Sequence, residues 1–187
     1  GAAPTVVSGL AEVTQVVAGA RHACALVGDQ VYCWGANDRG QLGQTTSTRA
    51  CRVGDVDIPC ETTPRLVETL TQVVSITAGA AHTCARTVEN LVVCWGDDRY
   101  GQLGGGRATA TPVPYPRAVL SGENPMDRIE EVTAGDNFTC ARDTEGAVRC
   151  WGENADGQLG RPFEGEVPMN CSGPCAPTAS RARPGAC

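Results

Sequence analysis

Cysteine is the residue type in this chain with the clearest chemistry. The 187 residues include 11 cysteines, and thiols at this density serve either as metal ligands or as disulfide partners. The chain has no C-x2-C pair and its only histidines are His22 and His82, so a zinc ribbon or finger is not expected. We therefore predict disulfides and a secreted, extracellular protein (or a periplasmic or cell-surface one), because disulfides persist in oxidising compartments.

The two histidines are the candidates for catalysis. A catalytic His22 or His82 would need a nucleophile or carboxylate beside it, and none accompanies them in the repeated sequence around them. Phe138 stands at the corresponding position of a third repeat. Both histidines are therefore predicted to be structural, and the chain is not expected to be an enzyme or to bind a cofactor.

Acidic turn residues are the candidates for binding a cation. Asp38, Asp97, Asp98 or Asp156 could offer the oxygen ligands that calcium prefers. Because Asp38, Asp97 and Asp156 do not align among the repeats, we predict solvated turns and no metal site.

Three copies of one unit must position these side chains. Segments 16–43, 76–104 and 132–160 share the pattern A-G-x-x-[HF]-x-C-A, then V-x-C-W-G, then G-Q-L-G. The first cysteine of the pattern, Cys24, recurs as Cys84 and Cys140. Short runs rich in Val, Thr, Tyr and Trp alternate with Gly, Asp and Asn, and no segment keeps a helical apolar period, so each unit is predicted to be β-structure. The repeated tryptophans, predicted to be structural, are Trp34, Trp95 and Trp151.

The first hairpin turn predicts which cysteines face each other. Gly28-Asp29 fits a two-residue turn with glycine first, which places Cys24 directly opposite Cys33. By alternation this is a non-hydrogen-bonded pair, where antiparallel strands approach most closely, so a disulfide is sterically natural.

The other two hairpins have loops one residue longer. Asn90 and Gly146 fall at the last loop position, where a left-handed residue is needed. Each predicted disulfide closes a loop of about ten residues and is worth roughly 2.5–3 kcal/mol. The predicted pairs are Cys24–Cys33, Cys84–Cys94 and Cys140–Cys150.

An Asn or Asp residue precedes each G-Q-L-G segment at the same place in all three repeats. Asn37, Asp98 and Asn154 stand three residues after each tryptophan, where an Asn or Asp side chain can cap its own turn. The glycines permit positive φ and a close approach of neighbouring backbone.

Together these motifs resemble the repeat of the regulator of chromosome condensation family. The resemblance covers roughly residues 4–165, and the Cys-bearing variant is similar to repeats in secreted bacterial proteins. It implies β-propeller blades, each a four-stranded antiparallel sheet, usually seven around an axis. Members of the family carry out nucleotide exchange, light sensing or enzyme inhibition, so the fold does not imply one function.

Three units are too few to close a propeller, which needs about four blades. We predict one repeat domain, 1–187, with units of approximately 4–60, 61–120 and 121–187 and Cys-bracketed insertions at 44–63 and 161–187. A short strand is expected at 4–7, and no clear strand after residue 160. The chain could be a fragment of a longer propeller, one member of a ring of copies, or part of an open filament.

The remaining cysteines bear on these alternatives. Cys51 and Cys60 bracket the first insertion and are predicted to pin it. Cys171, Cys175 and Cys187 form a set of three, so at least one is free or bonded to another chain. Sequons at Asn137 and Asn170 are possible glycosylation sites.

Charge and hydropathy exclude two classes of partner. Net charge is −6 and all 15 basic residues are arginine, so nucleic acid is not an expected partner. No apolar run approaches the ~20 residues needed to cross a bilayer, so membrane insertion is not expected. No basic segment followed by an apolar one stands at the start, so any signal peptide is expected to have been removed already.

The function predicted from all of these features is that of a non-catalytic extracellular structural or adhesive protein, which assembles with further copies into a ring or filament. The alternative is a protein-binding module or fragment of a larger secreted propeller protein, including an enzyme-inhibitor-like role.

Overall fold

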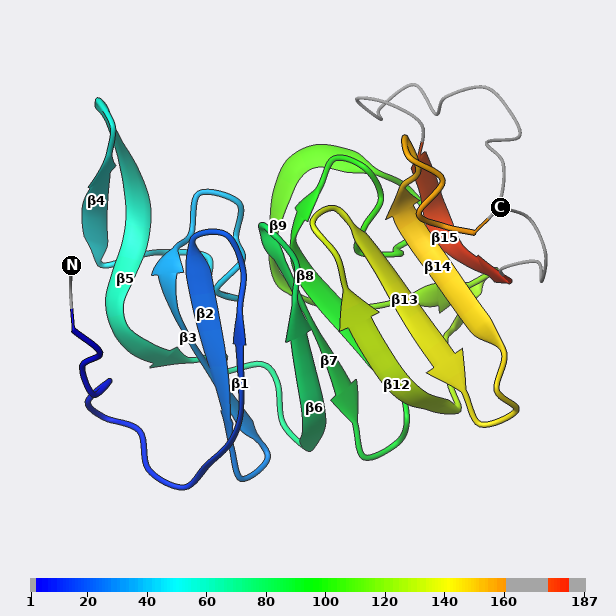
Figure 1. The fold of residues 1–187 in the computed structure, drawn as a ribbon, viewed down its shortest axis with the longest axis horizontal. Helices are drawn as coiled ribbons and strands as arrows, with labels where there is room; N and C mark the ends of the chain where they lie inside the picture. The colour runs from blue at the N-terminus through cyan, green and yellow to red at the C-terminus, as the bar shows by residue number, and fades with distance from the viewer. Residues whose placement is uncertain (1–2, 161–174, 182–187) are drawn as a thin grey trace.

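Three antiparallel sheets lie side by side in chain order in the computed structural model, which describes residues 3–160 and 175–181 (Figure 1). No helix occurs in these ranges. The all-β blade architecture predicted from the repeats is confirmed. We call the sheets blade 1, blade 2 and blade 3.

Neighbouring strands in each blade are antiparallel, and blades 2 and 3 are simple meanders. Blade 1 has the order β1-β2-β3-β5-β4, blade 2 the order β6-β7-β8-β9 and blade 3 the order β12-β13-β14-β15. A small hairpin, β10–β11, lies between blades 2 and 3 in the sequence. The bounds are β1 Val13–Ala18, β2 His22–Val27, β3 Gln30–Ala36, β4 Arg49–Val53, β5 Val56–Leu66, β6 Val73–Ala78, β7 His82–Thr87, β8 Val92–Asp98, β9 Thr109–Ala118, β10 Leu120–Ser121, β11 Asn124–Pro125, β12 Ile129–Ala134, β13 Phe138–Asp143, β14 Val148–Glu153 and β15 Cys175–Arg181.

The central hairpin of every blade has the predicted register. Cys24 lies opposite Cys33 in β2 and β3, and the corresponding pairs face each other in the other two blades. Asn90 has φ 60° and Gly146 has φ 81°, so both take the left-handed conformation that a three-residue hairpin loop requires.

The first insertion is not a loop. Residues 49–66 form the β4–β5 hairpin, and the long strand β5 also pairs with β3, through Ala36 with Cys60 and Tyr32 with Leu66. Blade 1 therefore has five strands instead of the predicted four, because one continuous strand serves both the insertion and the sheet.

Two strand predictions near the chain ends were wrong. Residues 4–7 form no strand, and Val6 is exposed; a β-prone run becomes a strand only where a neighbouring strand can pair with it. Conversely, β15 pairs with β14, through Glu153 with Cys175 and Arg149 with Arg181. Its sequence has no apolar alternation, so only the pairing reveals it.

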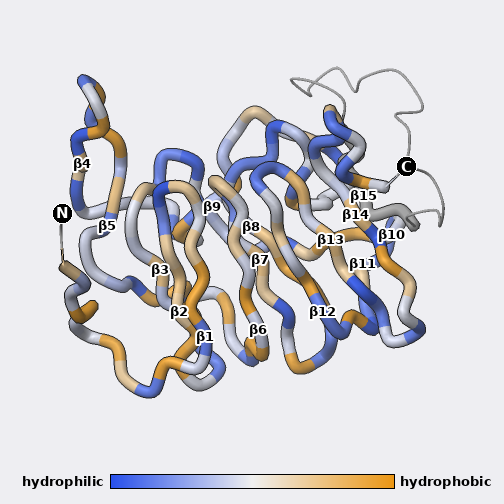
Figure 2. Tube along the Cα trace, viewed as in Figure 1, coloured by the Kyte–Doolittle hydropathy of each residue, from blue (hydrophilic) through white to orange (hydrophobic). Residues whose placement is uncertain are grey.

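The core lies between the blades. Strand β6 packs against β1 and β2, and β12 packs against β6 and β7. One buried cluster joins blade 1 residues such as Leu26 and Val31 to Val73 and Ile76 of blade 2. Figure 2 shows apolar segments within the strands and hydrophilic segments at many of the connecting loops. Each of the two buried clusters therefore spans two neighbouring blades.

Candidate functional site

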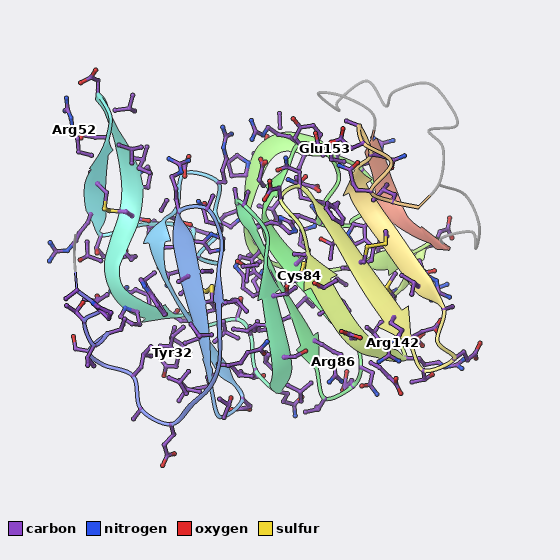
Figure 3. The ribbon with its side chains drawn as sticks, in the orientation of Figure 1. Tyr32, Arg52, Cys84, Arg86, Arg142 and Glu153 are labelled. Carbon is purple, nitrogen blue, oxygen red and sulfur yellow. A yellow bond between two sulfur atoms is a disulfide. The ribbon has the colours of Figure 1, made fainter. Side chains whose placement is uncertain are left out.

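A disulfide crosses the central hairpin of each blade. The Cα atoms of Cys24–Cys33, Cys84–Cys94 and Cys140–Cys150 are 4.1 Å apart in each pair, and Cys84 lies in the middle of blade 2 (Figure 3).

A fourth disulfide joins the two strands of the β4–β5 hairpin. Cys51 and Cys60 are bonded with their Cα atoms 5.8 Å apart. The hairpin tip carries Arg52 and projects from blade 1 (Figure 3). The backbone of Cys175 begins β15, whereas Cys171 and Cys187 lie outside the described residues.

The first histidine links blade 1 to blade 2. His22 Nε2 lies 2.9 Å from Thr83 Oγ1, and that hydroxyl donates to the backbone oxygen of Gln41 at 3.0 Å. Trp95 Nε1 donates to the same oxygen at 3.0 Å. Because the only hydroxyl hydrogen of Thr83 goes to Gln41, the hydrogen between ring and hydroxyl belongs to His22 Nε2, and the histidine is the donor.

The second histidine repeats this arrangement between blades 2 and 3. His82 Nε2 lies 2.9 Å from Thr139 Oγ1, which donates to the backbone oxygen of Gln102 at 2.9 Å. Trp151 Nε1 also donates to this oxygen at 2.9 Å. Burial lowers the pKa of His82 to about 3 and that of His22 to about 4, so both rings are neutral and serve as hydrogen-bond donors between blades.

The sequence carries a signal for this network that the repeat motifs alone do not reveal. A histidine in one unit accompanies a threonine in the next, at positions 22 and 83 and again at 82 and 139. The two members lie 57 to 61 residues apart, and only the stacking of blades brings them together.

The G-Q-L-G turns are capped as expected, although over a longer span. Oδ1 of Asn37, Asp98 and Asn154 accepts a hydrogen bond from the backbone nitrogen five residues on, at 3.1 Å in each blade.

The aspartates of blade 2 are not solvated, contrary to the prediction. Asp97 and Asp98 are buried at the end of strand β8, where Asp98 pairs with Thr109 of β9, and burial raises the pKa of Asp98 to about 7. No cluster suited to a metal ion occurs among the described side chains.

Blade 1 leaves one apolar face uncovered. Val13 is 43% and Val16 is 64% exposed, whereas the equivalent Val73 and Ile76 of blade 2 are buried against blade 1. Trp34 is also only half-buried, although its counterparts in the other blades are fully buried. We call this surface the leading face.

Blade 3 leaves the opposite face uncovered. Val148 is 41% exposed, whereas the equivalent Val31 and Val92 are fully buried beneath the following blade. We call the surface of blade 3 around Phe138, Val148 and Gln158 the trailing face. Blades 1 and 3 lie at opposite ends of the array (Figure 1).

A shallow groove separates the β4–β5 hairpin from β9. Its apolar walls come from Ile58 and Pro59 on one side and Pro112 and Pro114 on the other. The groove is a second place at which an extended segment of a partner could lie.

The first sequon lies beside blade 3. Asn137 is half-buried and its Nδ2 donates to a carboxylate oxygen of Glu153 at 3.0 Å. Asn170 lies outside the described residues. Glycosylation at both positions stays a prediction. The described part of the chain contains no helix long and apolar enough to span a membrane.

Known proteins with similar sequences share this repeat. The profile of the regulator of chromosome condensation (RCC1) repeat matches residues 29–86 and 89–142, and a second profile of the same repeat matches 13–41, 73–102 and 129–158. The ultraviolet-B receptor UVR8 of Arabidopsis thaliana is 35% identical over 147 residues, covering 78% of this chain and 30% of that protein. The probable E3 ubiquitin-protein ligase HERC4 of Mus musculus is 34% identical over 152 residues, covering 80% of this chain and 13% of that protein.

Solved structures show the same fold. Yeast RCC1 (Prp20), in a crystal structure bound to Kap60, superposes with a TM-score of 0.71 at 22% identity, over 95% of this chain and 38% of that chain. Prp20p of Saccharomyces cerevisiae, described with its binding properties to Gsp1p and histones, gives a TM-score of 0.72 at 22% identity, over 94% of this chain and 40% of that one. The chain thus spans well under half the length of these proteins. From the repeat profiles and these relatives together, the chain belongs to the regulator of chromosome condensation (RCC1) repeat family.

Proposed function

We propose that this chain is a non-catalytic protein-association module of an extracellular, oxidising compartment, with a structural or adhesive role. The observation that carries the proposal is the pair of uncovered apolar faces. Val16 and Val148 are exposed at positions that are buried wherever one blade meets another. Apolar surfaces of this kind mark sites of protein contact. Repeats of this family are typically non-catalytic binding or regulatory modules.

The disulfides support the oxidising compartment. Four bonds occur among the described residues, three of them in the blade cores. Bonds of this kind persist outside the reducing cytosol. We expect intact-mass analysis of the protein, alkylated without reductant as its cells deliver it, to show all eight of these cysteines protected. Alkylation of the buried pairs would contradict the compartment.

Photo-crosslinking tests the association. A benzophenone amino acid is placed at Val16 in one variant and at Val148 in another, with Val56 on the exposed β4–β5 hairpin as the matched control. The end-face positions are expected to crosslink to protein in the native extracellular medium, and the control is not. Equal yields at all three positions would overturn the proposal.

The groove beside β9 supports a second candidate, recognition of a different protein. Proline at 112 and 114 gives this wall a rigid, apolar shape with few backbone donors. A partner held there would crosslink from the hairpin and not from the two end faces, which separates the candidates.

A further inference from the structure

The two interfaces inside the array use one set of contacts. A threonine and a tryptophan of the later blade lie directly opposite each other on neighbouring strands, as Thr83 does with Trp95. Their side chains donate to the backbone oxygen of a glutamine in the earlier blade, Gln41 in this case. A histidine of the earlier blade, His22, donates to the threonine.

At the two ends of the array, apolar residues replace the histidine and the threonine that bond to each other between blades. Ala23, opposite Trp34, occupies the threonine position of blade 1, and Phe138 occupies the histidine position of blade 3. Removing one member of a buried hydrogen bond leaves a polar group unpaired, whereas replacing both with apolar groups of similar shape can be nearly neutral. Ala23 and Phe138 are therefore complementary to each other.

On the trailing face, the loop that would accept a tryptophan of a following blade has the same geometry as in blades 1 and 2. Gln158 Oε1 accepts a hydrogen bond from the backbone nitrogen of Asp156 at 2.9 Å, as the glutamines of blades 1 and 2 do in their loops. Gly160 has φ 66°, close to the 67° of Gly104, where the indole nitrogen of Trp151 comes within 2.7 Å of the place a Cβ would occupy.

The leading face offers the matching donor. Within residues 3–160 and 175–181, no donor reaches the backbone oxygen of Gln158. The half-buried Trp34 has no glutamine oxygen of a preceding blade to bind within these ranges. Each end thus presents the half of the contact that the other end lacks.

We propose that the trailing face of one copy receives the leading face of a second copy, head to tail. Phe138 of the first copy then packs against Ala23 of the second copy. Trp34 Nε1 of the second copy donates to the backbone oxygen of Gln158 of the first. Val16 of the second copy is buried over the disulfide and Val148 of blade 3. The proposal rests on the proposed function as an association module, and it names the partner as the chain itself. The interface is heterologous, so it propagates to a ring or a filament.

Two charged variants test whether this contact joins the leading face of one copy to the trailing face of another. Val16→Asp blocks only the leading face and Val148→Asp blocks only the trailing face, while Val56→Asp on the exposed hairpin is the control. Light scattering and sedimentation are expected to show concentration-dependent association of the wild type and control, and each end variant weakened at least about tenfold, since a charge would be buried. Mixing the two end variants one to one is expected to give a heterodimer of two 19.4 kDa chains, because one intact face of each kind remains.

A monomeric wild type at every concentration would overturn the proposal, as would end variants that fail to complement each other when mixed. Crosslinking to a different protein by a wild type that stays monomeric would leave the proposed function standing and refute only the head-to-tail contact.

A second pair of variants tests the residue register. Phe138→His alone places an unpaired donor in the interface and is expected to weaken association about tenfold. Adding Ala23→Thr supplies the acceptor across the interface, and the double variant is expected to recover association. Unchanged unfolding midpoints of the separated monomers control for folding. A double variant as weak as the single one would refute the pairing of Phe138 with Ala23.

Discussion

The His82–Thr139 hydrogen bond is expected to show strong energetic coupling in a double-mutant cycle. Thr139→Ala leaves His82 Nε2–H buried without its acceptor, and Nδ1 of the same ring already has no partner. It also removes the hydrogen bond to the backbone oxygen of Gln102, although Trp151 still donates there. An unpaired buried donor costs about 1–3 kcal/mol and the second bond about 1 kcal/mol, so the single variant is expected to lose about 2–4 kcal/mol of unfolding free energy.

The partner substitution, His82→Phe, is expected to be milder. Thr139 keeps its own donation to Gln102, so only one net hydrogen bond is lost, about 1 kcal/mol. A phenyl ring suits the place: the His82 ring contacts Gly79, and Phe138 contacts Gly135 in the same way in blade 3. In the double variant no donor is left unpaired, so its loss is expected to fall about 1–2 kcal/mol short of the sum of the two single losses.

Urea unfolding of the disulfide-intact proteins, followed by tryptophan fluorescence, measures the cycle. The control cycle combines His82→Phe with Thr111→Ala, an exposed residue of β9, and is expected to be additive within about 0.5 kcal/mol. If the His82–Thr139 cycle were equally additive, the hydrogen-bonded contact between blades would be energetically irrelevant and the reasoning from it would fail.

Three further outcomes are expected from the same measurements. Burial lowers the pKa of His22 to about 4 and of His82 to about 3, so below pH 6.5 the unfolded chain binds protons before the folded protein does. The unfolding free energy is therefore expected to fall with pH, by about 2 kcal/mol per histidine at pH 5. A urea midpoint insensitive to pH from 7 to 5 in the Asp98→Asn background would contradict this. The raised pKa of Asp98 has the opposite effect, because unfolding free energy is lost as pH rises from about 4 to 7. Asp98→Asn is therefore expected to raise the unfolding free energy by on the order of a few kcal/mol above pH 7 and to remove this pH dependence. An unchanged unfolding free energy would mean that burying the ionised carboxylate costs nothing. Replacing Cys84 and Cys94 together by serine is expected to lower the unfolding free energy by about 3 kcal/mol, read from thermal or urea melts against the oxidised parent, and an unchanged melt would show that the disulfide adds nothing to stability.

The strand register of the central hairpins could be predicted from the sequence because the turn residues determine it. Gly28 and Gly146 each permit one hairpin geometry, and that geometry determines which residues lie opposite each other across the strands. The register of the central hairpins and the capping residue Asn37 followed from this reasoning.

Features that depend on distant partners could not be predicted. Strand β15 exists because it pairs with the edge of β14, whereas residues 4–7, despite stronger strand propensity, form no strand in the described structure. The burial of Asp98 likewise is not visible in its own turn, because Asp98 is buried where β8 pairs with Thr109 of β9.

The sequence by itself therefore determined the three hairpins, their disulfides and the family to which the repeats belong, since these depend on contacts within about ten residues. The tertiary structure decided what the histidines do and where the array is open. His22 and Thr83 meet only when one blade stacks on the next, and the exposure of Val16 and Val148 is a property of their position at the ends of that stack. The physical reason is that contacts between blades join residues some sixty positions apart, and only the packed sheets determine which of them face each other.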